Sequence, residues 1–341
     1  LRAAKGGRRS YATHPRHNAK LVARPSGFAP DCLLPMARTY FGTDGIRGKA
    51  NEGNMTPEVA FRLGAAVTHQ ARQRVRHAPR VVVGKDTRVS GYLFEYSLSA
   101  GICAMGGRVL LTGPLPTPAV AHLTTSMRAD VGVMISASHN PYEDNGIKFF
   151  SHDGFKLPDE QEETLETLMA SGELDRKRPV GMHIGRAERI ETAWGRYVQF
   201  IKGAFPTELT LDGLKVVVDA AHGAAYQTAP HVFSELGATV VPIGVKPNGK
   251  NINQDRGAMH PQYCAKEVLR AHANVGFALD GDADRVVVID EKGRQVYDAV
   301  WMHIAGAAGL DVNARTATPT SLTMYEITRF PYANQATRDP V

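Results

Sequence analysis

Between residues 56 and 135, segments with the hydrophobic spacing of a helix alternate with segments that have the hydrophobic pattern of a strand. Thr56 and Pro57 form a helix start signal, and the apolar residues that follow recur every four positions, at Val59, Leu63 and Val67. The other predicted elements of this half are strands at 80–83, 108–111 and 131–135 and a helix over 94–104. Because strands and helices alternate, the pattern predicts a parallel sheet covered on both faces.

The same order recurs in the second half of the chain. Its predicted elements are strands at 216–218, 239–241, 275–279 and 286–289, a helical stretch that ends before Gly237, and an amphipathic helix over 263–272. Residues 130–138 align with residues 274–282 without a gap. We therefore expect an α/β protein with two repeated doubly wound domains, each with a polar loop at the carboxyl end of the corresponding strand.

The predicted domains are separated by an acidic helix over 159–169, a Gly-rich and Arg-rich stretch, and a helix near residues 194–201. We place the first domain at 36–190 and the second at 191–298. Residues 1–35 lack a sustained period and are excluded from the fold. They are interpreted as a transit peptide, a disordered arm, or upstream sequence before a start at Met36, and we favour the last.

Three carboxylates follow the predicted strand at 275–279, in Asp280-Gly-Asp-Ala-Asp-Arg285. Clustered acids repel one another unless a cation compensates them, and oxygen ligands favour Mg²⁺ or Ca²⁺. We expect Gly281 to let the loop curl so that the acids converge. A solvated acidic turn is the alternative. An EF-hand is excluded, because Arg285 occupies the position that requires glycine and a strand follows instead of a helix.

The equivalent loop of the first repeat reads Ser136-Ala-Ser-His-Asn-Pro141, and Ser138 aligns with Asp282. A serine beside a hard divalent ion suits phosphoryl transfer, in which positioning and charge neutralisation dominate. A serine hydrolase is disfavoured, since the chain has no G-x-S-x-G and His139 would point away from Ser138 in an extended chain. Ser138 as a simple turn former is the alternative.

Composition narrows the class of protein. The net charge is +6, but residues 1–35 hold seven of the 40 basic residues and one acid, which leaves 33 basic against 33 acidic residues. A nucleic-acid-binding face should appear as clustered Lys and Arg with interleaved aromatic residues, and none is visible from Met36 onward, so we do not expect nucleic acid as a partner. The three cysteines show no disulfide or zinc spacing, and no apolar run is long enough for a membrane span. We expect a cytoplasmic protein, with no indication of an oligomer.

Three motifs resemble those of the α-D-phosphohexomutases, and most closely those of the bacterial phosphoglucosamine mutases. They are residues 41–48, residues 135–141 with 144–148, and residues 280–285, and the resemblance extends over residues 38–298. It implies a phosphoserine at Ser138, an Mg²⁺ ion held by Asp280, Asp282, Asp284 and Ser138, and Arg47 and Lys148 beside the transferring phosphoryl group. It also implies that Lys148 is a general acid/base and that Arg285 and His139 help to position the phosphoryl group.

The implied reaction interconverts glucosamine 6-phosphate and glucosamine 1-phosphate through glucosamine 1,6-bisphosphate, for cell-wall amino sugars. A phosphomannomutase/phosphoglucomutase, or an inactive metal-binding fragment, is the alternative. Residues 299–341 match no family motif. We expect a vestigial third domain, an absent fourth domain and a shifted or truncated coding sequence, with reduced or lost activity because the clamp for the distal phosphate is missing.

Overall fold

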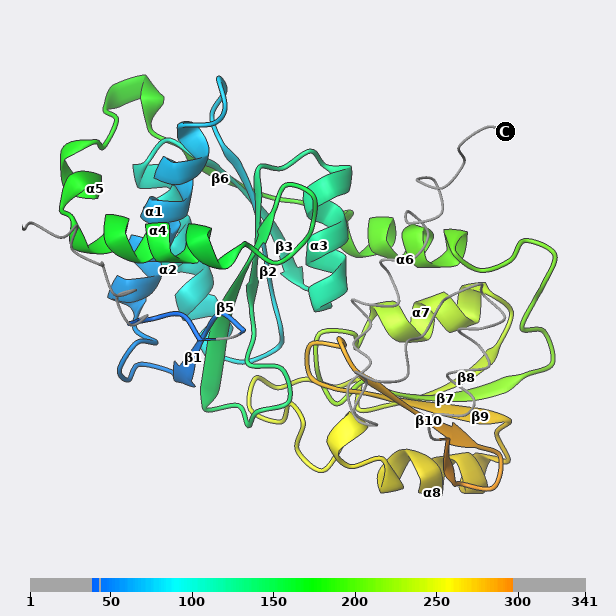
Figure 1. The fold of residues 1–341 in the computed structure, drawn as a ribbon. Coiled ribbons are helices and arrows are strands. Elements are labelled where there is room, and N and C mark those ends of the chain that lie inside the picture. The colour runs from blue at the N-terminus through cyan, green and yellow to red at the C-terminus, as the bar shows by residue number, and fades with distance from the viewer. Residues whose placement is uncertain (1–38, 43, 297–341) are drawn as a thin grey trace, which may run out of the picture. The chain divides into compact units, whose positions relative to one another are not determined.

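The structure, a computed structural model, describes residues 39–42 and 44–296, which contain two mixed β-sheets with helices packed on them (Figure 1). The first sheet has the order β1 (Ile46–Lys49), β5 (Asp144–Ser151), β4 (Val131–Ile135), β2 (Arg80–Lys85), β3 (Arg108–Pro114) and β6 (Arg186–Arg189). Strands β4, β2, β3 and β6 are parallel, whereas β5 is antiparallel to β4 and β1. The three strands predicted for this half are confirmed.

Helices cover both faces of the first sheet. The helices of this half are α1 (Pro57–Arg72), α2 (Ser90–Ala104), α3 (Thr117–Ser126), α4 (Asp159–Ala170) and α5 (Glu173–Arg176), followed by the 3-10 turn η1 (Gly181–His183). Successive residues of β2 enter opposite cores, because side chains alternate along a strand. Val81 and Val83 pack in the cluster of α1 and α2, whereas Val82 packs in that of α3. Thr56 caps α1 as predicted, accepting a hydrogen bond from the Val59 amide at 3.4 Å.

The second sheet has the order β11 (Gln295–Val296), β10 (Val286–Asp290), β9 (Val275–Leu279), β7 (Lys215–Asp219) and β8 (Thr239–Ile243). Strands β7, β8 and β9 are parallel, and β10 is antiparallel to β9. Helix α8 (Gln262–Ala271) packs on one face through Cys264 and Val268, and α7 (Thr228–Glu235) packs on the other through Phe233. The 3-10 turn η2 (Gly257–Met259) precedes α8.

The two sheets share one topology, which confirms the internal repeat. The order β5-β4-β2-β3 of the first sheet corresponds to β10-β9-β7-β8 of the second, and β4 and β9 have the bounds that the ungapped alignment requires. The expectation of wholly parallel sheets is wrong for β5 and β10. Each of these strands returns through a short loop after its predecessor, and such a loop can join only antiparallel neighbours.

Helix α6 (Ala193–Gly203) lies between the two repeats in the sequence and contacts both. Its Ala193 and Tyr197 belong to the hydrophobic cluster of α3, and α6 also packs on α7. The domain limits at residues 190 and 298 therefore stay a prediction. The leader at 1–35 and the tail at 299–341 lie outside the described residues. No helix among the described residues is long and apolar enough to cross a membrane.

Candidate active site

The loops that follow β4 and β9 meet at the carboxyl ends of these strands. Ser138 lies in the first loop, and its hydroxyl donates a hydrogen bond to Asp280 Oδ2 at 2.7 Å. Thr117, at the start of α3, also binds the second loop: its amide donates to the Asp282 carbonyl at 2.9 Å and its hydroxyl to Asp282 Oδ2 at 2.7 Å. Ser138, Asp280 and Asp282 are all buried. The two aligned polar loops thus form one site.

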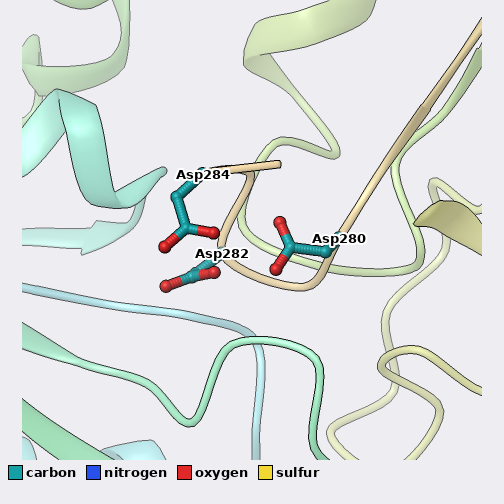
Figure 2. A group of neighbouring side chains, drawn as sticks. All are labelled: Asp280, Asp282 and Asp284. Atoms are coloured by element: carbon teal, nitrogen blue, oxygen red, sulfur yellow. The ribbon is translucent and has the colours of Figure 1, made fainter. Parts of the chain in front are cut away.

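Three carboxylates converge in the loop between β9 and β10, as Figure 2 shows. One oxygen from each of Asp280, Asp282 and Asp284 lies within 4.8 Å of the others. The expectation that Gly281 lets this loop curl is only partly right, since the residue with a left-handed backbone is Ala283, with φ 56°. Gly281 is needed for close approach, because a Cβ there would lie 2.6 Å from the Ser138 carbonyl oxygen.

The electrostatics of this acidic loop favour a bound cation. Burial, followed by the charges of its two neighbours, raises the pKa of Asp280 well above its usual range. Burial and Asp282 raise the pKa of Asp284 to about 6. Asp282 Oδ1 and Asp284 Oδ1 are buried without a hydrogen-bond partner among the described residues. Two unpartnered anionic oxygens beside a third carboxylate fit the oxygen ligand set of Mg²⁺.

Lys148 of β5 supplies a positive charge to the same loop. Its Nζ lies 3.3 Å from Asp44 Oδ2, 3.4 Å from Asp282 Oδ2 and 3.6 Å from Asp284 Oδ2. Burial acts to lower the pKa of Lys148, but the three carboxylates outweigh it and the pKa is raised. Reciprocally, burial acts to raise the pKa of Asp282, yet Lys148 and the Thr117 hydroxyl lower it. Lys148 is therefore a charged ammonium.

Three further side chains predicted from the sequence border the loop. Arg47 of β1 pairs with Asp44, and Arg285 Nε lies 3.9 Å from Asp284 Oδ1. The Nε atoms of both arginines are buried without a hydrogen-bond partner among the described residues. Burial, followed by Arg285 and Arg47, lowers the pKa of His139. A neutral imidazole and two partly exposed guanidinium groups make this rim suitable for a phosphate.

The predicted orientation of His139 is wrong. Its Nδ1 lies 3.5 Å from Ser138 Oγ, at the outer limit of a hydrogen bond. The backbone at Ser138 is left-handed, with φ 54°, and not extended, so that the alternation of side chains along a strand does not apply there.

Sequence reasoning missed Asp44, Arg88 and Asn253. Asp44 pairs with Arg47 and Lys148, and the side chains of Arg88 and Asn253 both donate to the Ser138 carbonyl. Arg88 could have been found by position, since it follows the carboxyl end of β2, where α/β sheets place their sites. Asn253 lies in a loop without such a signal.

Comparison with known proteins agrees with this geometry. Residues 38–176 match the family described as phosphoglucomutase/phosphomannomutase, alpha/beta/alpha domain I, and residues 195–293 match its domain II. A phosphoglucosamine mutase of Sorangium cellulosum is 57% identical over 284 residues, which are 83% of this chain and 59% of that protein. One of Anaeromyxobacter dehalogenans is 57% identical, over 83% of this chain and 62% of that protein.

A similar solved structure is a phosphoglucomutase/phosphomannomutase family protein from Burkholderia thailandensis. It has a TM-score of 0.66 and 26% sequence identity, and the match covers 79% of this chain and 59% of that one. The chain thus spans about three fifths of the length of the relatives that it matches.

Proposed function

This chain belongs to the phosphoglucomutase/phosphomannomutase family, and we propose that it transfers a phosphoryl group between the 6- and 1-hydroxyls of glucosamine, as a phosphoglucosamine mutase does. The observation that carries the proposal is the contact of Ser138 Oγ with an acidic loop bordered by Lys148, Arg47 and Arg285. In this proposal residues 36–190 form the phosphoserine domain and residues 191–298 the metal domain.

The three carboxylates would hold one Mg²⁺ ion, with an oxygen of Ser138 or of its phosphoryl group as a further ligand. The ion would neutralise negative charge on the transferring phosphoryl group. The unpartnered oxygens of Asp282 and Asp284 support this assignment, since they have no protein donor among the described residues. Arg47 and Arg285 would bind the remaining phosphoryl oxygens through their partly exposed guanidinium groups.

The first half of the reaction would begin with phosphorylated Ser138. A hydroxyl oxygen of the substrate bonds to phosphorus while the bond between phosphorus and Ser138 Oγ breaks, which gives the 1,6-bisphosphate. Because Lys148 is held as an ammonium, it can donate a proton to Ser138 Oγ and then receive the proton of the sugar hydroxyl. His139, with its lowered pKa, would stay neutral beside the serine. The second half reverses these steps at the other phosphate.

Mass spectrometry of the purified chain after incubation with a hexose 1,6-bisphosphate tests the phosphoryl transfer. We expect one phosphate at Ser138, and none in Ser138→Ala. A coupled assay with the 6-phosphates of glucosamine, glucose and mannose then tests the sugar. Turnover of glucose or mannose phosphate in preference to the amino sugar would favour the phosphomannomutase/phosphoglucomutase alternative. Phosphorylation without turnover would favour an inactive fragment, and absence of phosphoserine would contradict the proposal.

A further inference from the structure

Ser138 has an unfavourable backbone conformation that neighbouring groups must stabilise. Its φ of 54° lies in the left-handed region, which residues other than glycine rarely adopt. Its amide donates to Ser136 Oγ at 2.9 Å, and the Ser136 hydroxyl donates to Asp86 Oδ2 at 2.7 Å. Such a conformation persists only where surrounding contacts over-determine it, and residues in such conformations cluster at functional sites.

Arg88 provides most of these contacts from the first repeat, in the loop between β2 and α2. Its side chain is fully buried, and Asp86 Oδ2 accepts a hydrogen bond from its Nε at 2.8 Å. Nη2 donates to the carbonyls of Ser138 and Asn140 at 2.8 and 2.9 Å. Nη1 donates to the Asp144 carbonyl at 3.1 Å and to the Pro141 carbonyl. One guanidinium thus holds three carbonyls of the loop between β4 and β5, residues 136–143, here called the serine loop, and the carbonyl of the first residue of β5. Lysine cannot reproduce this fork of donors.

Asn253 reaches two of the same carbonyls from the second repeat. It lies in the loop between β8 and η2, and its Nδ2 donates to the Ser138 carbonyl at 2.9 Å and to the Asn140 carbonyl at 3.1 Å. Its side chain is buried, and its own backbone is anchored by a hydrogen bond from its amide to the Ala221 carbonyl at 2.9 Å. The Ser138 and Asn140 carbonyls are therefore bound from both repeats.

We propose that Arg88 and Asn253 are positioning residues, which clamp the Ser138 and Asn140 carbonyls so that Ser138 Oγ stays against the acidic loop. Through this carbonyl clamp, the position of Ser138 Oγ depends on contact between the two repeats, since each repeat provides one donor. The role of the clamp in catalysis rests on the proposed phosphoryl transfer. The hydrogen bonds of the two side chains go to the serine loop, to the Asp144 carbonyl and to Asp86, so the clamp acts on Ser138 and contacts none of the three carboxylates of the acidic loop.

Phosphorylation of the full 341-residue chain by α-glucose 1,6-bisphosphate gives the first test. In this step the phosphorus leaves a sugar oxygen for Ser138 Oγ, and the serine proton replaces it on the sugar. The maximal rate should fall about tenfold in Asn253→Ala and about 100-fold in Arg88→Lys. Two quantities should stay within about twofold of their values in the unmodified chain. They are the bisphosphate concentration that gives half the maximal rate, and the affinity for Mn²⁺, which is used as a probe of the proposed Mg²⁺ site. Neither side chain is assigned to bind these ligands.

Asn251→Ala is the matched control, and its rate should equal that of the unmodified chain. Asn251 lies in the same loop and makes comparable hydrogen bonds, at 2.9 Å to the Asn248 amide and at 3.0 Å to the Lys246 carbonyl, but none to the serine loop. Equal loss in Asn251→Ala and Asn253→Ala, or loss of Mn²⁺ affinity in parallel with the rate, would show a general loop effect and overturn the proposal.

Hydrogen exchange gives a second test that requires no phosphoryl transfer. The amides of residues 136–140 should exchange about tenfold faster in Asn253→Ala than in the unmodified chain, whereas the amides of β2 should be unchanged. Unchanged exchange at residues 136–140 would overturn the clamp even if Arg88→Lys failed to fold. If the unmodified chain accepts no phosphate, the proposed function fails for this chain, while the exchange comparison still decides whether the clamp exists.

Discussion

Replacing Gly281 by alanine should separate the serine loop from the acidic loop. The added Cβ would lie 2.6 Å from the Ser138 carbonyl oxygen and 2.7 Å from Asn253 Nδ2. Ordinary contacts begin at 3.4 Å, so the carbonyl must retreat by about 0.8 Å. It cannot do so freely, because Arg88 and Asn253 hold it. We expect a loss of about 1–3 kcal/mol in the free energy of unfolding, as for overpacked cores.

The same displacement should reduce the rate of Ser138 phosphorylation about 100-fold, because misplacement by about 1 Å can cost this much. Urea unfolding measures the stability, and intact-protein mass spectrometry after addition of a hexose 1,6-bisphosphate measures the rate. Gly195→Ala is the control, since a Cβ at this position in α6 has nothing within 4 Å. It should stabilise the chain by up to about 1 kcal/mol. Parental stability and rate in Gly281→Ala would refute the close approach of the loops.

Three further predictions concern the charges and the thiol. Asp282→Asn should weaken Mg²⁺ binding at least about tenfold in calorimetry, since a ligand loses its charge, with little change in melting temperature. Unchanged affinity would remove the metal assignment. Without metal, the free energy of unfolding should fall as pH rises from about 4 to above 6. The folded-state pKa values of Asp280 and Asp284 are raised, the latter to about 6, so in this range the folded state binds more protons than the unfolded one. Mg²⁺ should accordingly raise the melting temperature more at pH 7 than at pH 5, and an equal rise at both would contradict this. Burial raises the pKa of Cys264 to about 12, so iodoacetamide at pH 8 should label this thiol in urea but not in the folded chain; labelling of folded protein would show that the thiol is accessible.

Much of the fold could be predicted from local signals. The start of α1 follows from Thr56 and Pro57, and the equal bounds of β4 and β9 follow from the ungapped alignment of two apolar runs. Strand β5 was missed because its residues 144–151 mix polar and apolar positions, and a polar residue such as Lys148 does not indicate a buried strand. The structure shows that three carboxylates compensate this lysine, which no local pattern records.

The candidate site was predictable where its residues follow strands, and less so where loops meet. Asp280, Asp282 and Ser138 could be placed because each follows an apolar strand. The side-chain hydrogen bonds of Asn253 could not be foreseen, because they join residues 115 and 113 positions apart in the sequence. The His139 error has a similar origin, since the left-handed conformation of Ser138 depends on tertiary contacts and not on its residue type.

The position of Lys148 also bears on whether this chain can fold before the proposed metal ion binds. Because a preformed metal site rarely exists in an unfolded chain, many small metal-binding domains fold only when the metal binds. Here the acidic loop has a counterion that is part of the polypeptide and lies within 3.6 Å of Asp282 and Asp284. We therefore expect the two repeats to assemble before the proposed ion is available, and that ion to enter, leave and be replaced while the surrounding chain stays folded.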